Sequence, residues 1–143
     1  MIDTKNLKSI IKNSSLPILV IGTQQFEKGI EILANTLPSF GCLISNFDQK
    51  QESQLVKNSI AFKITYGFDN GAKMQATDFH PSPRGDISGT SFKLNFRGNI
   101  LPIWIPHPFG KKSIYATLVI LSVCQVFNLN LVDVSRTLKS WQL

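Results

Sequence analysis

Short apolar runs and amphipathic stretches alternate over the first half of the chain. The run 16–21 is nearly continuous in apolar residues, which is typical of a strand buried on both faces. After it, apolar residues recur at helical spacing from Phe26 to Leu37, and Pro38 ends the pattern. The order of elements favours an α/β fold with a parallel sheet. Further patterns predict strands over 41–45 and 61–66 and a short surface helix over 49–58.

The pattern changes in the middle of the chain. The segment 73–79 predicts a strand, and the prolines and the glycine over 81–85 predict a loop. Polar and apolar residues then alternate over 90–96, a turn is expected at 97–99, and 100–105 forms the returning strand. These segments predict a small antiparallel β insert.

Two helices are expected in the C-terminal part. Apolar residues cover nearly every side of the stretch 113–129, which indicates a central, buried helix. Polar residues interrupt this stretch, and it is shorter than the ~20 residues that a membrane span needs. A final amphipathic helix over 132–143 turns Val134, Leu138 and Trp141 inward. The sequence therefore predicts an α/β fold with a partial parallel sheet, flanking helices and a small antiparallel β insert.

Composition supports a compact chain. Of its 143 residues, 43% are hydrophobic and 17% are charged, which excludes a disordered tail and suits one domain with a core. We expect a polar N-terminal segment over 1–15 and an α/β domain over 16–143. Because residues 1–15 hold no apolar core of a signal peptide, we expect a cytoplasmic protein without membrane association.

The net charge of +6 is compatible with an acidic partner. The cations are scattered, however: Lys5, Lys8 and Lys12 form a loose group, and Lys111 and Lys112 form one pair. No motif of a nucleic-acid-binding domain is present. We interpret the charge as that of a solvated surface and do not expect nucleic acid as a partner. Binding of a nucleic acid or another anionic polymer is an alternative that depends on the net charge alone.

Cysteines and histidines show no metal-ligand pattern. Cys42 and Cys124 lie far apart in apolar segments, which is typical of reduced core residues. His80 and His107 are the only histidines, prolines flank both, and we predict that they lie in loops. We therefore predict no metal site.

Two places carry residue types that bind ligands. Asn46 and Asp48 follow a predicted parallel strand, where α/β folds bind ligands, but the same residue types also end strands and begin turns. Lys111 and Lys112 precede the long helix, where each exposed cation opposes the helix dipole by ~0.3–1 kcal/mol. Either a bound anion relieves this repulsion or both side chains extend into solvent.

Three segments resemble, in their order along the chain, the second half of the central, ATP-binding domain of the Mur ligases. The segment 31–48 is similar to that family's helix and strand ending in Asn-x-Asp-Asp, and 89–94 to its Gly-Thr-x-Phe-x-Leu strand. The segment 105–129 is similar to its Gly-x-His-Asn-x-x-Asn helix. Mur ligases use ATP to join amino acids to a peptidoglycan precursor. The chain most resembles the UDP-N-acetylmuramoyl-tripeptide D-alanyl-D-alanine ligase type.

The resemblance implies roles for particular residues. Asn46, Asp48, Lys112 and Ser113 stand at cofactor-binding positions, with ATP and Mg²⁺ as the family's cofactors. The family's modified lysine, which helps to hold a second Mg²⁺, falls near Lys28, so Lys28 is the one candidate catalytic residue.

The chain also departs from the family pattern. It contains no Gly-x-x-x-x-Gly-Lys-Ser/Thr loop for the phosphates, and it begins downstream of the place where that loop is expected. Gln49 replaces the last carboxylate of Asn-x-Asp-Asp, and Ala116 replaces the last Asn of the helix motif. The family's neighbouring metal-site histidine is missing, and Gln24 and Gln25 stand near its position.

These departures set the functional expectation. We expect a truncated or degenerate Mur ligase-like domain, a pseudoenzyme that binds no cofactor and catalyses no ligation by itself. The alternative is an interaction module, which pairs with itself or with a partner chain that supplies the phosphate loop.

Overall fold

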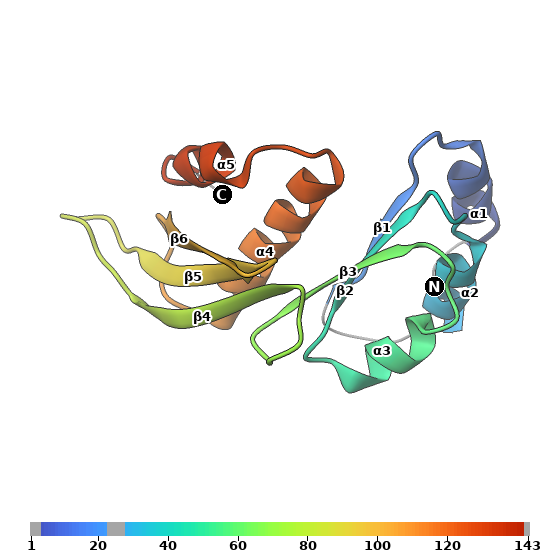
Figure 1. Ribbon diagram of the computed structural model, residues 1–143, viewed down its shortest axis with the longest axis horizontal. Helices are drawn as coiled ribbons and strands as arrows, with labels where there is room; N and C mark the ends of the chain where they lie inside the picture. Colours follow the sequence, from blue (N-terminus) through green and yellow to red (C-terminus); the bar gives the residue numbers. More distant parts are fainter. Residues whose placement is uncertain (1–3, 23–27, 142–143) are drawn as a thin grey trace. The chain divides into compact units, whose positions relative to one another are not determined.

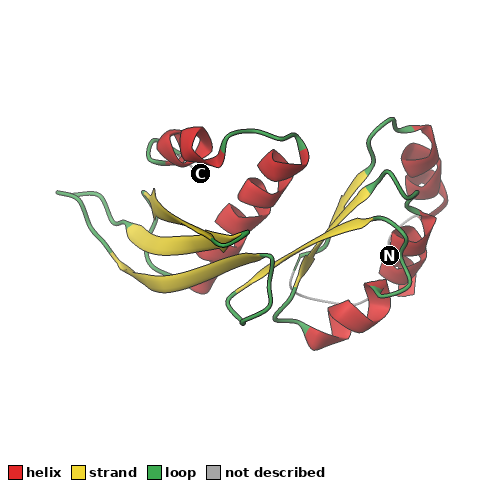
Figure 2. Ribbon diagram, in the orientation of Figure 1, coloured by secondary structure: helices red, strands yellow, loops and turns green. Residues whose placement is uncertain are grey.

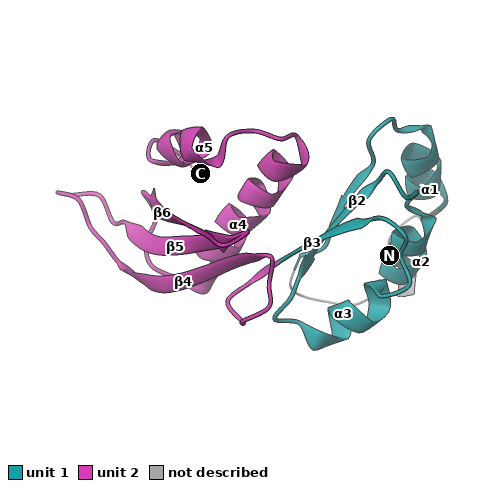
Figure 3. Cartoon of the chain, in the orientation of Figure 1, with its two compact units in different colours: residues 1–65 teal, residues 66–143 magenta. Residues whose placement is uncertain are grey.

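The computed structural model describes residues 4–22 and 28–141. Two compact units divide the chain, 1–65 and 66–143 (Figure 3). The helices are α1 (Thr4–Asn13), α2 (Lys28–Thr36), α3 (Lys50–Val56), α4 (Lys111–Val126) and α5 (Leu131–Leu138) (Figure 1). The strands are β1 (Ile18–Val20), β2 (Cys42–Asn46), β3 (Phe62–Gly67), β4 (Met74–Pro81), β5 (Thr90–Phe96) and β6 (Asn99–Ile105).

The strands form a mixed sheet in the order β1-β2-β3-β4-β5-β6. The pairs β1–β2 and β3–β4 are parallel, whereas the pairs β4–β5 and β5–β6 are antiparallel (Figure 2). The predicted α/β class, with a partial parallel sheet, flanking helices and an antiparallel β insert, is confirmed. The domain boundary expected after residue 15 stays a prediction.

Apolar side chains from helices and strands form the core of the first unit. Every residue of β2 is buried, which explains why the run 42–44 is apolar on both faces of the sheet. The Ser59 hydroxyl donates a hydrogen bond to the Ala34 carbonyl at 2.7 Å and so ties the segment before β3 to α2. The core consists of Ile21, Ala34, Leu37, Leu43, Val56 and Ala61, with Ile11, Leu19, Ile30 and Leu55 packed against it.

The N-terminal part of this unit differs from the sequence-based expectation in two ways. Strand β1 is shorter than the predicted run 16–21 and begins after Pro17, which has no N–H to donate. The Pro17 carbonyl still accepts a hydrogen bond from the Cys42 N–H at 2.9 Å, so pairing with β2 begins there. The segment 1–15, predicted only to be polar, contains α1, and Ile11 of this helix packs against the core.

The second unit packs α4 against the antiparallel strands. Arg97 and Gly98 join β5 to β6, and their φ angles of +51° and +76° are those of a two-residue type I′ turn, as the right-handed twist of a hairpin favours. The buried residues of this unit include Met74, Ala76, Phe92, Leu94, Ile103 and Ile105 of the strands and Ile114, Leu118 and Leu121 of α4.

Helix α4 is buried on one face rather than on all sides. Its remaining apolar residues, such as Val119 and Val123, are half-buried. No helix in the described part of the chain has both the length and the hydrophobicity that crossing a membrane requires.

The last helix is shorter than predicted. Helix α5 ends at Leu138, and Trp141 lies in the following turn, where its N–H donates to the Leu138 carbonyl at 3.1 Å. Such i to i+3 hydrogen bonds are typical of the tight turn that follows a helix. The end of the predicted helix, 142–143, lies outside the described residues.

Candidate functional site

Asn46 holds the turn that follows β2. Its Oδ1 accepts a hydrogen bond from the Asp48 N–H at 2.9 Å, and its carbonyl accepts one from the Gln49 N–H at 3.3 Å. Asn46 is buried and Asp48 is half-buried. This geometry is an Asx turn, so Asn46 does end a strand and begin a turn. A cofactor-binding role of Asn46 and Asp48 stays a prediction.

Glu52 of α3 lies against the same turn. Its Oε1 accepts a hydrogen bond from the Asn46 N–H at 2.6 Å, and the residue is 0% exposed. Burial raises the pKa of the Glu52 carboxyl to about 8, while the hydrogen bond from Asn46 lowers it. Glu52 is therefore mostly protonated and neutral at pH 7.

Two buried polar atoms at this turn have no hydrogen-bond partner in the described part of the chain. They are Asn46 Nδ2 and Glu52 Oε2. An unsatisfied buried polar group costs about 1–3 kcal/mol. The amide N–H₂ of Asn46 and the O–H of protonated Glu52 are both donors, so together they suit an oxygen acceptor. The sequence does not indicate that Asn46 and Glu52 meet, because Glu52 stands in a polar stretch that is typical of a solvated helix face.

The candidate catalytic residue lies at the edge of the described structure. Lys28 is the first residue of α2, and its side chain is outside the described residues, as are Gln24 and Gln25. The role of Lys28 stays a prediction. In the described part of the chain, His, Cys, Asp and Glu side chains form no group of three or more that is able to hold a metal ion.

The first turn of α4 carries the other two predicted cofactor-binding residues. Lys112 is exposed, and the Ser113 hydroxyl donates to the Gly110 carbonyl at 2.9 Å. Lys111 Nζ lies 5.5 Å from the centroid of the Phe68 ring, a cation–π contact. This first turn has no acidic residue, so the free N–H groups of the helix and the two cations together favour an anion.

Aromatic rings surround this end of α4. The Phe68 ring packs edge-to-face against Tyr115 at 4.9 Å and against Phe79 at 4.9 Å. The rings of Phe79 and Phe109 stack at 6.2 Å with 16° between their planes, and they are 39% and 47% exposed. Exposed ring faces beside two lysines match the chemistry of a planar ligand that carries negative charge.

Within each unit the structure brings two of the predicted residues together. Asn46 and Asp48 share one turn in the first unit, and Lys112 and Ser113 are adjacent in the second unit.

The two histidines differ in their surroundings. His80 lies in β4, so the predicted loop position is wrong; the strand continues to Pro81, and His80 Nδ1 lies 3.0 Å from the Asp78 carbonyl. His107 follows β6, as expected of a loop residue, and packs edge-to-face against Trp141 at 5.1 Å. The buried His107 Nε2 has no hydrogen-bond partner in the described residues.

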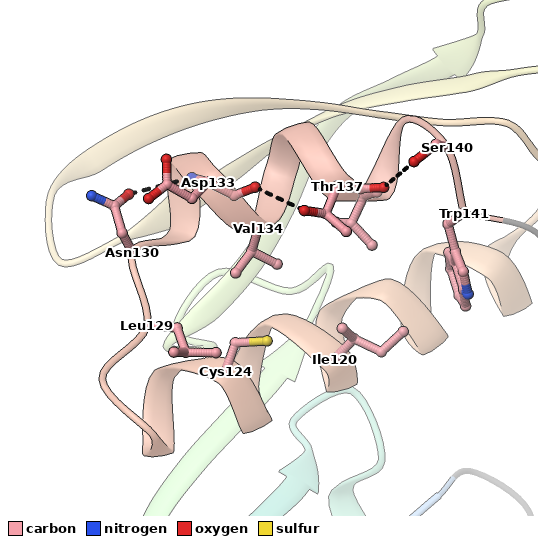
Figure 4. A pocket seen from close by; sticks show the side chains of 10 residues that line it. Ile120, Cys124, Leu129, Asn130, Asp133, Val134, Thr137, Ser140 and Trp141 are labelled. Atoms are coloured by element: carbon pink, nitrogen blue, oxygen red, sulfur yellow. Dashed lines mark hydrogen bonds between the residues drawn. The ribbon is translucent and has the colours of Figure 1, made fainter.

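A mostly apolar hollow of about 650 Å³ lies between α4 and α5 (Figure 4). Neither cysteine forms a disulfide; Cys42 is buried, whereas Cys124 is half-buried on the wall of this hollow. Burial raises the pKa of the Cys124 thiol. The hollow is lined by Ile120, Cys124, Leu129, Asn130, Asp133, Val134, Thr137, Leu138, Ser140 and Trp141.

Comparison with known sequences gives one informative relative. No family model matches the chain. Over 91 residues the chain is 33% identical to UDP-N-acetylmuramoyl-L-alanyl-D-glutamate–2,6-diaminopimelate ligase of Chlamydia caviae. These residues cover 64% of this chain and 18% of that ligase.

Solved structures share the fold. Crystal structure I of MurF from Acinetobacter baumannii matches 98% of this chain and 31% of its own chain, with a TM-score of 0.73 and 14% identity. A structure of UDP-N-acetylmuramoylalanyl-D-glutamyl-2,6-diaminopimelate–D-alanyl-D-alanyl ligase from the same organism matches 87% of this chain and 29% of its own, with a TM-score of 0.69 and 12% identity. The chain thus spans less than a third of the proteins that it matches. The chain is thus similar in sequence to a segment of one Mur ligase and shares its fold with a segment of MurF.

Proposed function

We propose that this chain is a Mur ligase-like domain that does not catalyse ATP-dependent ligation by itself. One observation carries the proposal: the 143 residues contain no Gly-x-x-x-x-Gly-Lys-Ser/Thr loop. Phosphoryl transfer depends almost entirely on positioning and on electrostatic stabilisation of the phosphates. Without that loop, the chain lacks the backbone N–H groups and the lysine that supply most of this stabilisation.

The two candidate pairs support a partial site. Asn46 Oδ1 is engaged with the Asp48 N–H, and the Ser113 hydroxyl is engaged with the Gly110 carbonyl. Ala116, on the exposed side of α4, has no group that hydrogen-bonds a base. What remains for a nucleotide is the surface at the start of α4 that Phe79, Phe109, Lys111 and Lys112 form. This surface suits a base or one phosphate rather than a triphosphate with Mg²⁺.

A pair of titrations tests this proposal. Isothermal titration of the chain with adenosine and with Mg·ATP should give dissociation constants that agree within about threefold, both weaker than ~100 µM, because the phosphates gain little. Micromolar binding of Mg·ATP, about 100-fold tighter than adenosine, would overturn the proposal.

The alternative function, an interaction module, is favoured by exposed apolar residues in the first unit. Phe40, Ile60 and Phe62 are 61%, 72% and 55% exposed. The Phe62 N–H donates to the Gly41 carbonyl at 3.0 Å, so the two phenylalanines lie on neighbouring chain segments. Exposed apolar surface of this kind is typical of a contact with another protein chain.

Light scattering after size exclusion tests this alternative. We expect the average mass to rise with protein concentration, and Phe62→Ser to return it toward the monomer. Phe127→Ser, at a residue of the second unit that is also 55% exposed, is the matched control and should leave the mass unchanged. A strict monomer at millimolar concentration, or equal effects of both variants, would remove the self-association form of this proposal.

A further inference from the structure

A second hollow, of about 500 Å³, lies on the antiparallel sheet of the second unit. Its wall includes Asp78, His80, Arg84, Lys93, Trp104 and Lys139, and we call it the Arg84 pocket. Its volume is within the range of small-molecule sites.

Strand register explains why these residues meet. Ser91 pairs with His80 on one side and with Trp104 on the other, so the three side chains lie on one face of the sheet. Lys93, two residues along β5, lies on the same face. Phe92, between Ser91 and Lys93, also lines the pocket but is only 2% exposed, so polar and charged side chains supply most of the exposed wall.

Arg84 is held in place before any ligand binds. The backbone N–H of Arg84 donates to the Ile87 carbonyl at 2.9 Å, and the Arg84 carbonyl accepts from the Ile87 backbone N–H at 3.1 Å. The guanidinium carbon lies 4.1 Å from the centroid of the Trp104 ring. Trp104 is itself fixed, because its indole N–H donates to the Ser82 carbonyl at 2.8 Å. Stacking occupies one face of the guanidinium and leaves its N–H edge for a bidentate contact.

Strain and charge both mark the pocket. A bulge in β4 between Thr77 and His80 gives Asp78 a φ of +50°, a conformation that non-glycine residues rarely adopt. The bulge directs Asp78 to Lys93, with 2.7 Å between Oδ2 and Nζ. In the described part of the chain neither Arg84 nor Lys139 forms an ion pair. Three cations thus line the pocket against one carboxylate.

We propose that the Arg84 pocket binds a small ligand through a carboxylate or phosphate group. Arg84 supplies the bidentate contact, and Lys139 and the paired Lys93 supply further positive charge. The proposal goes beyond the function proposed above, because none of these residues belongs to the candidate nucleotide positions.

Trp104 is the reporter for the test. Trp141→Phe leaves Trp104 as the single tryptophan, and pyrophosphate and citrate at constant ionic strength represent the two oxyanion classes. We expect saturable quenching or enhancement of Trp104 fluorescence by one or both probes, and the tighter probe identifies the class. Arg84→Gln should weaken binding at least about tenfold. Arg84→Lys should weaken it by less, because lysine keeps the positive charge and loses only the bidentate N–H geometry of the guanidinium.

Lys57→Gln, an exposed charge of the first unit, is the matched control and should bind like the parent. Amide NMR shifts of the natural chain give a second readout that does not depend on the Trp141 substitution. Saturable shifts at Arg84, Lys93 and Lys139 support the proposal. It is overturned by shifts centred elsewhere, by no saturation below about 10 mM, or by equal affinity of the Arg84→Gln and Lys57→Gln variants.

Discussion

The carboxyl group of Glu52 links the turn after β2 to the solution pH. Its pKa in the folded chain is about 8, above the ordinary value of 4.5, because of burial. The folded state therefore binds more protons than the unfolded state between these values, and stability is lost as pH rises through that window. We expect the free energy of unfolding to fall from pH 5 to pH 8, by at most ~1.4 kcal/mol per pH unit from this group.

Glu52→Gln isolates this effect. Glutamine keeps the oxygen that accepts from the Asn46 N–H and cannot ionise, so urea unfolding should show a flatter pH dependence and equal or greater stability at pH 8. Glu31→Gln on α2 is the matched control and should keep the slope of the natural chain. An unchanged slope in Glu52→Gln would contradict the assignment.

Gly89 gives a second prediction at the scale of one residue. A Cβ at this position would overlap the Ser82 carbonyl and lie 2.6 Å from the Trp104 ring. Gly89→Ala should therefore cost about 1–3 kcal/mol of stability and displace the loop that carries Arg84. Gly22→Ala, where nothing lies within 4 Å, is the control for urea unfolding monitored by tryptophan fluorescence. Equal stability of the two variants would argue against the close contact.

At the scale of elements, the N-cap of α5 is a separable contribution. Asn130 Oδ1 accepts from the Val132 N–H at 2.9 Å and from the Asp133 N–H at 3.4 Å. Asn130→Ala should lower stability by about 1 kcal/mol, a fall of ~3 °C in thermal midpoint. Asn130→Asp keeps the acceptor and adds a charge that the helix dipole favours, so it should melt at or above the natural midpoint. A drop of the same size in both variants would show that the cap is not the cause.

The spacing of apolar residues was sufficient to predict most helices and strands, but it missed α1 and misplaced the end of α5. The apolar run of β2 and the alternation of β5 reflect burial directly, so both strands were predictable. Helix α1 was missed because its short apolar stripe, with Leu7 and Ile11, lies among lysines. The end of α5 was misplaced because Trp141 continues the helical spacing although its N–H bonds at i−3.

At the scale of the whole chain, the net charge of +6 leads to a negative prediction. The cations are scattered or gathered in groups of two or three, so few phosphates of a polymer are neutralised at once. We expect no DNA or RNA binding tighter than ~100 µM at about 50 mM salt, where electrostatic attraction is strong. Fluorescence anisotropy with labelled oligonucleotides measures this, and micromolar binding that weakens steeply with salt would reveal a polymer site.

The places of the candidate residues in the fold were predictable only where a motif marks them. Asn46 and Ser113 stand at the end of a strand and at the start of a helix, as their sequence neighbours indicate. The burial of Glu52 and the meeting of Arg84 with Trp104 depend on packing between distant segments. A local pattern contains no information about such packing, so these features became visible only in three dimensions.

The thiol of Cys124 lies on the wall between the two C-terminal helices, so its rate of alkylation reports how often these helices separate. Cys42 is enclosed in the other unit, so slow alkylation by a maleimide should mark Cys124 first. Its raised pKa makes the reaction accelerate with alkalinity while the helices stay together. If a variant is labelled faster than the natural chain at the same pH, then α5 separates from α4 more often in that variant. Calorimetry, which measures global unfolding, would not detect this local opening.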